Sequence, residues 1–189
     1  MAEGIWKEER MEVFWEWEER MLLYIQDYLR SDVLTPVFQA ITSLGNAGVI
    51  WILLALLFLF FPKTRRAGLA GIAALLLSLL VNNLLLKNLI ARVRPFDMIE
   101  GLTFLGKKPI DFSFPSGHTA ASFASATAFY LFLPKKAGIP LLVLAGLIAL
   151  SRLYLGVHFP TDVAVGALDG ILLGLFAFRI ISYKDRKKE

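Results

Sequence analysis

The stretch SRLYLGVHFPTD, residues 151–162, lies between two apolar runs and contains an arginine, a histidine and an aspartate. Such side chains are costly in apolar surroundings unless they are paired or reach water. Pro160 is typical of a first helical turn, which would place Asp162 in that turn and His158 just before it. The carboxylate could then accept a hydrogen bond from one imidazole nitrogen and leave the other as a nucleophile or base, while Arg152 holds an anion. Phosphoryl chemistry is one interpretation, and a buried histidine bonded to a neighbour is the other.

Composition places the chain among membrane proteins. It has 189 residues, of which 57% are hydrophobic, and its mean hydropathy is +0.61. This profile is typical of a single multispanning helical domain. The chain has no cysteine and two histidines, which excludes a disulfide framework, a thiolate metal site and a histidine-rich metal site. The net charge of +4 is modest, and the bases flank apolar runs, which indicates membrane orientation and not nucleic-acid binding.

Five apolar runs predict an all-α polytopic membrane bundle of about five transmembrane helices. The runs are residues 47–61, 67–86, 117–133, 137–150 and 163–178. Several fall short of the ~20 residues that cross a bilayer comfortably, so we expect tilting or local thinning. Gly166, Gly170 and Gly174 recur every fourth residue and predict the close approach of another helix. Three polar residues within the runs are interpreted as interhelical hydrogen-bonding groups, the role of the last staying open: Asn82, Asn83 and Asp169.

Residues 1–32 are predicted to form an amphipathic helical segment at the membrane interface, ahead of a membrane domain over residues 33–183. Its apolar residues recur three or four apart, at Phe14, Trp17, Met21, Ile25 and Tyr28, and glutamates mark another face, at Glu8, Glu12, Glu16 and Glu19. A helix packed on the protein's own surface is the alternative. Ser31 and Asp32 could cap a second short helix that has Pro36 near its start and Gly45 near its end.

Basic connections between the runs predict the orientation. Alternation places three of them on one side, which the positive-inside rule makes cytoplasmic: Lys63 with Arg65 and Arg66, Lys135 with Lys136, and the basic tail 184–189. The extracytoplasmic side then also carries bases, against the usual preference: Lys87, Arg92, Arg94, Lys107, Lys108 and Arg152. Such an exception indicates that these charges have a local role.

Three clusters share this extracytoplasmic side. Lys87 and Arg94 are seven residues apart, so they would share a face if their helix persists to Pro95. The sequence FPSGH, residues 114–118, opens the third run, where free helix-start N–H groups could cradle a phosphate with His118 at the rim. The third cluster is the opening stretch. Each has a structural explanation alone, but coincidence explains poorly why both histidines and three cations gather on one face.

The pattern resembles the signature of the type 2 phosphatidic acid phosphatase superfamily, also called the lipid phosphate phosphatases. Its three parts are Lys-x6-Arg-Pro, Pro-Ser-Gly-His and Ser-Arg-x5-His-x3-Asp, and they match here at residues 87–95, 115–118 and 151–162. The resemblance covers about residues 33–180. In size and topology, though by no motif, the chain is most similar to the bacterial undecaprenyl-diphosphate phosphatases of this superfamily. The superfamily also includes vanadate-dependent haloperoxidases, but these are soluble, so the five apolar runs argue against them.

The resemblance implies a role for each motif residue. His158 would attack phosphorus and form a phosphohistidine, Asp162 would orient His158, and His118 would protonate the leaving oxygen and then activate water. The phosphoryl oxygens would be held by Lys87, Arg94, Arg152, Ser116 and the backbone N–H of Gly117. No metal or other cofactor is expected, because phosphoryl transfer asks mainly for positioning and for compensation of negative charge.

We therefore expect a multi-pass plasma-membrane phosphatase that removes the terminal phosphate of a lipid phosphate or diphosphate, with undecaprenyl diphosphate as the leading substrate. Phosphatidylglycerophosphate and phosphatidic acid are alternatives, because the motifs read the phosphate and not the tail. A non-catalytic lipid-phosphate binder or translocator is a rival of another class, against which the intact His158, Asp162 and His118 argue. The expected partners are the lipid substrate and the bilayer, with no nucleic acid, and the oligomeric state stays open.

Overall fold

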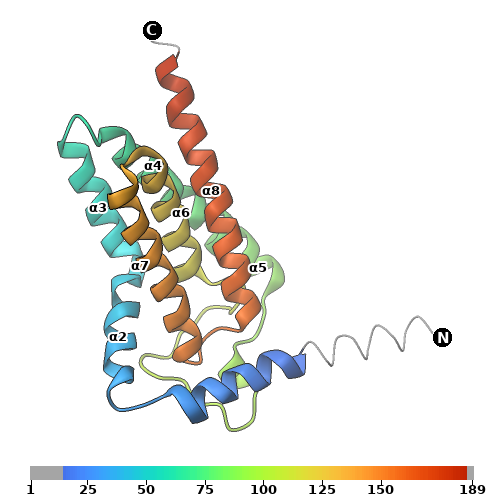
Figure 1. Cartoon of the computed structure of the whole chain (residues 1–189). Helices are drawn as coiled ribbons and strands as arrows, with labels where there is room; N and C mark the ends of the chain where they lie inside the picture. Colours follow the sequence, from blue (N-terminus) through green and yellow to red (C-terminus); the bar gives the residue numbers. More distant parts are fainter. Residues whose placement is uncertain (1–14, 187–189) are drawn as a thin grey trace.

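The computed structural model describes the backbone of residues 15–186, and it is helical with no strand over that range (Figure 1). Residues 15–24 form an α-helical segment that continues into η1 (Ile25–Leu29). The remaining elements are α2 (Leu34–Leu44), η2 (Asn46–Gly48), α3 (Val49–Phe60), α4 (Arg65–Ser78), η3 (Leu79–Leu86), α5 (Lys87–Ile90), η4 (Pro95–Asp97), α6 (Gly117–Phe132), α7 (Lys135–Tyr154) and α8 (Pro160–Arg186). The all-helical prediction is confirmed. Predictions for Glu8, Glu12, Phe14 and the side chains of the basic tail lie outside the described residues.

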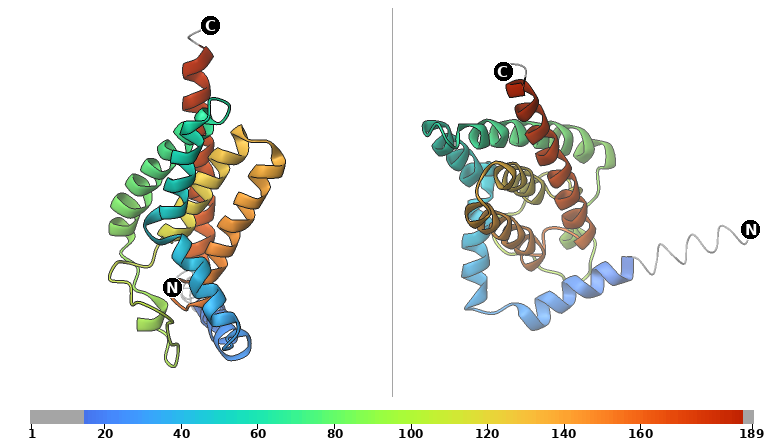
Figure 2. Two further views of the ribbon diagram at one scale, coloured as in Figure 1. Left: turned by 90° about the vertical axis from the view of Figure 1, so that its left-hand side faces the viewer. Right: turned by 45° about the horizontal axis from the view of Figure 1, so that its top comes forward.

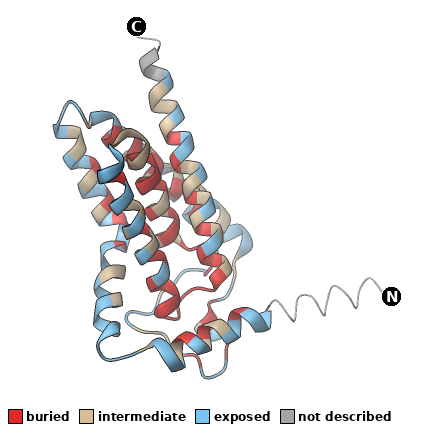
Figure 3. Ribbon diagram, viewed as in Figure 1, coloured by how far each residue is buried: buried red, intermediate tan, exposed pale blue. Residues whose placement is uncertain are grey.

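Helix α6 runs through the middle of the bundle, with α4, α7 and α8 packed around it (Figure 2). Apart from Phe129 its buried side chains are small, and the buried residues of the bundle gather along it (Figure 3). A Cβ at Gly170 of α8 would lie 2.5 Å from the Ala120 carbonyl oxygen, and one at Gly174 would lie 2.6 Å from that of Ala124. The predicted close approach at the glycine stripe is therefore a contact of α8 with α6, and it brings the starts of these two helices together.

Three helical stretches among residues 15–186 are long and apolar enough to cross a membrane: Arg65–Asp97, Lys135–Tyr154 and Pro160–Tyr183. A fourth crossing results if α2 and α3, which meet at a 46° bend, act as one broken span. The remaining predicted run is α6, which has 16 residues. The protein is thus a multi-pass helical membrane protein, and the count of five spans stays a prediction.

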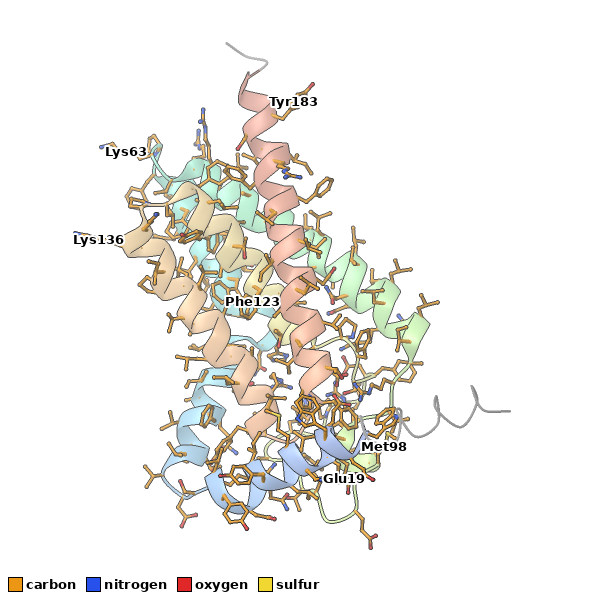
Figure 4. The ribbon with its side chains drawn as sticks, turned by 45° about the vertical axis from the view of Figure 1, so that its right-hand side comes forward. Glu19, Lys63, Met98, Phe123, Lys136 and Tyr183 are labelled. Carbon is orange, nitrogen blue, oxygen red and sulfur yellow. The ribbon has the colours of Figure 1, made fainter. Side chains whose placement is uncertain are left out.

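The two ends of the bundle differ in the residues that they carry. Lys63, Lys136 and Tyr183, which belong to or adjoin the three basic connections, lie at one end, whereas Glu19 and Met98 lie at the other (Figure 4). Alternation of the runs along the chain predicts this separation. The helical segment 15–24 lies across the second end of the bundle (Figure 1).

The N-terminal helical segment packs on the protein itself along part of its predicted apolar face. Leu22 and Ile25 are buried in a core cluster with residues of the loops and of α7 and α8. Trp17 and Tyr28 are exposed instead, so an aromatic edge remains for the predicted membrane interface. Val33, and not Ser31 or Asp32, lies directly before α2, and it forms no side-chain cap. Ser31 still contributes near the start of this helix, because its Oγ accepts a hydrogen bond from the Leu34 backbone N–H at 3.2 Å.

The helix that carries Lys87 ends earlier than predicted. It stops at Ile90, because Ala91 adopts a left-handed conformation with φ of 49°. Arg94 follows in extended conformation, and Pro95 opens the short η4 and does not end a helix. The prediction of one continuous helical face from Lys87 to Arg94 is wrong, and a turn brings the two side chains together instead.

Candidate active site

The three sequence motifs meet at one cavity of about 1270 Å³. It lies where α7 ends and where α6 and α8 begin. Most of the predicted site residues line it: Lys87, Arg94, Gly117, His118, Arg152 and His158. Ser116 and Asp162 are fully buried and stand in the wall behind this lining. A cavity that combines three cations with two imidazoles is suited to an anion that reacts with a base or nucleophile.

His158 lies two residues before the start of α8, and its two ring nitrogens face different groups. Its Nδ1 lies 3.4 Å from Asp162 Oδ2, and its Nε2 lies 3.4 Å from Arg94 Nη1. The same Asp162 oxygen accepts hydrogen bonds from the Phe159 backbone N–H at 2.9 Å and from Ser113 Oγ at 2.5 Å. Pro160 therefore begins the helix as predicted, and Asp162 in its first turn closes a loop around the imidazole.

The electrostatic surroundings of His158 keep its imidazole neutral. Burial, helped by the charges of the nearby Arg152 and Arg94 guanidiniums, lowers the pKa to about 3, against the opposing hydrogen bond to Asp162. At neutral pH the nitrogen next to Arg94 thus carries a lone pair and no proton if Nδ1–H points at Asp162. This is the protonation state that a nucleophile or base requires.

Asp111 occupies the position between the two cations of the first motif. Arg94 Nη2 donates to Asp111 Oδ1 at 2.6 Å, and Lys87 Nζ pairs with the other carboxylate oxygen. Partial burial would raise the pKa of this carboxyl, but its hydrogen bonds to Lys87 and Arg94 and their charges hold the pKa at about 2. Sequence reasoning missed Asp111, because it lies in an irregular loop where no periodicity singles it out.

Arg152 and His118 are held by residues of the elbow between α2 and α3. Arg152 Nη1 donates to Thr42 Oγ1 at 2.6 Å, and its Nε is buried without a partner among the described residues. His118 Nε2 lies 3.0 Å from Asn46 Oδ1. The elbow forms because Ala47 and Gly48 adopt left-handed conformations. Neither Thr42 nor Asn46 was predicted, although a helix break at Asn-Ala-Gly was a usable signal.

Ser116 and Gly117, both predicted to hold phosphoryl oxygens at the start of α6, differ in position, because Gly117 lines the cavity and Ser116 does not. The Ser116 backbone N–H donates to the Asp162 carbonyl at 3.0 Å, and its hydroxyl accepts from Thr119 Oγ1 at 2.9 Å. These bonds tie the starts of α6 and α8 together and direct the serine away from the cavity. Gly117 lines the cavity, and a Cβ there would lie 2.9 Å from Asn83 Oδ1.

Arg92, which is not one of the motif residues, stands behind Asp162. Its Nη1 donates to Asp162 Oδ1 at 2.6 Å, and its Nη2 donates to Glu18 Oε2 at 2.5 Å. Glu18 comes from the N-terminal helical segment and is fully buried. The catalytic-type pair of His158 and Asp162 therefore has one basic cluster in front and another ionic group behind.

The cavity continues from the cations into an apolar slot between α3 and α4. Its walls there are aliphatic: Ile52, Leu56, Ile72, Leu75, Leu76 and Leu79. Leu56 and Leu76 are also about half exposed on the outside of the bundle. The slot thus borders the surface that a bilayer would cover, and it joins an apolar path to an anion site.

This arrangement agrees with comparisons to known proteins. The PAP2 superfamily matches the chain over residues 67–186, which include all three motifs. The chain belongs to the PAP2 superfamily. It is 32% identical to an undecaprenyl-diphosphatase of Sulfolobus acidocaldarius over 74% of this chain and 67% of that protein. It is 31% identical to the undecaprenyl-diphosphatase BcrC of Bacillus subtilis over 79% of this chain and 76% of that protein.

A solved PAP2 structure also shares the fold. The PAP2 type phosphatidylglycerolphosphate phosphatase of Bacillus subtilis superposes with a TM-score of 0.71 at 29% identity, over 94% of this chain and 88% of that one. Membership of the PAP2 superfamily makes the protein a phosphatase-type hydrolase of lipid phosphates. The relatives carry names for different lipids, so family membership leaves the substrate of this PAP2 protein open.

Proposed function

We propose that this PAP2 protein hydrolyses undecaprenyl diphosphate to undecaprenyl phosphate and inorganic phosphate, through a phosphohistidine at His158 and without a metal ion. The observation that carries the proposal is the arrangement of His158. Its Nδ1 faces Asp162, and its Nε2 adjoins Arg94 in a cavity that also holds Lys87 and Arg152. The apolar slot between α3 and α4 supplies a path for a long prenyl chain.

The proposed reaction has two steps. His158 Nε2 attacks the terminal phosphorus, the bond from phosphorus to the bridging oxygen breaks, and undecaprenyl phosphate leaves with a proton from His118 where one is needed. Water then attacks the phosphohistidine, His118 takes a proton from that water, and the N–P bond breaks to release phosphate. The three cations balance the charge of the transferring group throughout, which is the task that a metal ion performs in other phosphatases.

The site is proposed to face the extracytoplasmic side. Lys63 and Lys136 lie at the end of the bundle opposite to Glu19 and Met98 (Figure 4). The positive-inside rule places the lysine end in the cytoplasm. A site at the other end would meet carrier-lipid diphosphate in the outer leaflet.

The test is phosphate release from four lipids in detergent micelles with EDTA: undecaprenyl diphosphate, undecaprenyl phosphate, phosphatidylglycerophosphate and phosphatidic acid. The wild type is compared with His158→Ala and with Arg20→Gln, which removes an exposed charge that does not line the cavity. We expect turnover of the diphosphate by the wild type and the control, and none by His158→Ala. Radiolabelled substrate should leave an alkali-stable, acid-labile label on the wild type during turnover. Right-side-out vesicles should hydrolyse an impermeant short-chain prenyl diphosphate before detergent is added.

The alternatives give distinct outcomes. A preference for a glycerolipid phosphate would move the protein to phospholipid metabolism and keep the mechanism. Full activity of His158→Ala would refute the nucleophile, and inhibition by EDTA would refute the metal-free reaction. Activity only after detergent would refute the orientation. Binding of lipid phosphate by folded protein without any release would favour the binder or translocator.

A further inference from the structure

Arg92 is a guanidinium bridge between the carboxylate of the reaction centre and the N-terminal helical segment. Its Nη1 donates to Asp162 Oδ1 at 2.6 Å and to Thr161 Oγ1 at 2.7 Å. Its Nη2 donates to Glu18 Oε2 at 2.5 Å. The two nitrogens thus hold two different carboxylates, which the forked shape of arginine permits and the single nitrogen of lysine does not.

Glu18 is committed to this bridge on both of its oxygens. While Oε2 accepts from Arg92, Oε1 accepts from the Thr161 backbone N–H at 3.0 Å and from Thr161 Oγ1 at 2.5 Å. The side chain is 0% exposed. A glutamate from the N-terminal segment therefore reaches the first turn of α8, one residue before Asp162.

Two aromatic rings fix the plane of the Arg92 guanidinium. Its central carbon lies 3.8 Å from the centroid of Phe159 and 4.8 Å from that of Trp15. The two rings also meet each other edge to face, with centroids 5.8 Å apart. Because Phe159 adjoins His158, this stack ties the orientation of Arg92 to the backbone that carries the imidazole.

Docking of the helix alone does not require buried charges. Leu22 and Ile25 already bury apolar surface, and Arg30 ties the end of the segment to the Tyr154 carbonyl at 3.0 Å. Burying a guanidinium with two carboxylates carries a desolvation penalty that well-packed apolar side chains avoid. The ionic contact is therefore better explained by what it does to Asp162 than by docking.

The charges on the two sides of His158 have opposite sums. Behind it, Glu18, Arg92 and Asp162 carry two negative charges and one positive charge. In front, three cations face one carboxylate, that of Asp111. When His158 bonds to phosphorus, its ring becomes positive while the phosphoryl oxygens stay negative. A negative cluster behind and a positive cluster in front both favour that state.

We propose that Arg92 and Glu18 are positioning residues, through which the N-terminal helical segment holds Asp162 against His158 and sets the negative charge behind it. The inference rests on the proposed reaction at His158. Arg92 does not belong to the lining of the cavity, so its effect should fall on the chemical step and not on substrate binding.

Three variants test separately the forked guanidinium of Arg92, the charge of Glu18 and the docking of the N-terminal helical segment. Arg92→Lys keeps the positive charge but cannot span both carboxylates, and we expect kcat to fall about ten- to a hundredfold, the range of one lost charged hydrogen bond. Glu18→Gln has the same shape, lacks the charge, and should lower kcat about tenfold. KM should stay within about twofold for both. The matched control is Arg30→Gln, which loosens the same segment without touching Asp162 and should keep kcat within about twofold.

A readout independent of turnover is ¹⁵N NMR of protein labelled at the histidine ring nitrogens, which are few enough to assign because the chain contains two histidines. Arg92→Lys and Glu18→Gln should shift the His158 nitrogens and leave those of His118 unchanged, and Arg30→Gln should shift neither. Thermal melts identify any variant that fails to fold, and the isosteric Glu18→Gln then carries the test alone.

The outcomes distinguish this inference from the proposed function. If the wild type releases no phosphate but Glu18→Gln still shifts the His158 signal, the positioning stands and the phosphatase proposal falls. If the wild type is active and both variants match Arg30→Gln in kcat and in the His158 signal, the inference is overturned. A rise in KM with unchanged kcat would also overturn it, because it would place Arg92 in substrate binding.

Discussion

Arg92 and Arg94 stand two residues apart in the chain but serve opposite sides of His158. Arg94 adjoins the Nε2 atom and pairs with Asp111, whose side chain is 51% exposed. Arg92 lies on the Nδ1 side and pairs with Glu18 and Asp162, which are both 0% exposed. Arg94, on the Nε2 side that we call the front, can exchange the half-exposed carboxylate of Asp111 for another anion with the help of water. Arg92, on the Nδ1 side that we call the rear, is bonded to two fully buried carboxylates, which cannot exchange in this way.

The difference teaches how one short segment can both hold substrate and hold the nucleophile. An anion site must be empty or weakly filled before the substrate arrives, so its cations need an exchangeable partner. A positioning group must not change during turnover, so its partners are best buried and fully bonded. The front should accordingly respond to substrate and inhibitors, and the rear should respond only in the rate of the chemical step.

The largest effect is expected at the front. Arg94→Met removes a donor to the transferring phosphoryl group, and we expect kcat/KM to fall about a hundred- to a thousandfold, as for a lost oxyanion donor. The melting temperature in detergent should also fall, because Arg94 donates to the backbone carbonyls of Asp111 and Val157 as well, so activity is compared well below the melting temperature of the variant. Steady-state phosphate release and thermal melts measure the two quantities. A loss no larger than that of Arg92→Lys, or one confined to kcat, would erase the distinction between the two sides.

The imidazole between the two sides should give a pH signature in stability. Burial lowers the pKa of folded His158 to about 3, while an unfolded histidine has a pKa of about 6.5. Between these values the unfolded state binds the extra proton. Stability from His158 is therefore complete above about pH 6.5 and falls as the pH drops, by about 1.4 kcal/mol per pH unit.

The measurement is the free energy of unfolding at pH 7, 6 and 5 for the wild type and His158→Gln. The carboxyl of Asp111, with a pKa of about 2, stays ionised over this range. The difference between the two proteins isolates His158, since both share every other group. Parallel pH curves would show that the imidazole is not held neutral between the clusters.

The sequence predicts the front of the site better than the rear because motif chemistry is local. Pro160 begins α8, and Asp162 therefore lies one turn from His158, as the spacing indicates. The glycines of α8 predicted the close contact that brings helix starts together. The sequence predicted that Lys87 and Arg94 would meet on one continuous helical face. The helix ends before Ala91 instead, and a turn brings the two side chains together. Alanine gives no turn signal, so the sequence did not predict this break.

The rear of the site depends on contacts that no local pattern encodes. Glu18 is one of several glutamates in the N-terminal segment, and only its docking on α8 makes it buried while Glu16 and Glu19 stay exposed. Arg92 meets Glu18 across 74 positions of chain. Helical periodicity identifies faces, but it does not say which charged residue a distant helix will cover.

The smallest effect is expected from Asp111, and it tests whether phosphate replaces the carboxylate of Asp111 on Lys87 and Arg94. Lys87 and Arg94 both bond its carboxylate, so a phosphate that takes these bonds must displace it. Asp111→Asn removes the competing charge, and inorganic phosphate should then inhibit about three- to tenfold more tightly, which corresponds to about 1 kcal/mol. The matched control is Asp27→Asn, an exposed acid that does not line the cavity, which should leave the inhibition constant unchanged. Weaker inhibition in Asp111→Asn would mean that the carboxylate orders the two cations for phosphate and does not compete with it, and the front would then resemble the rear.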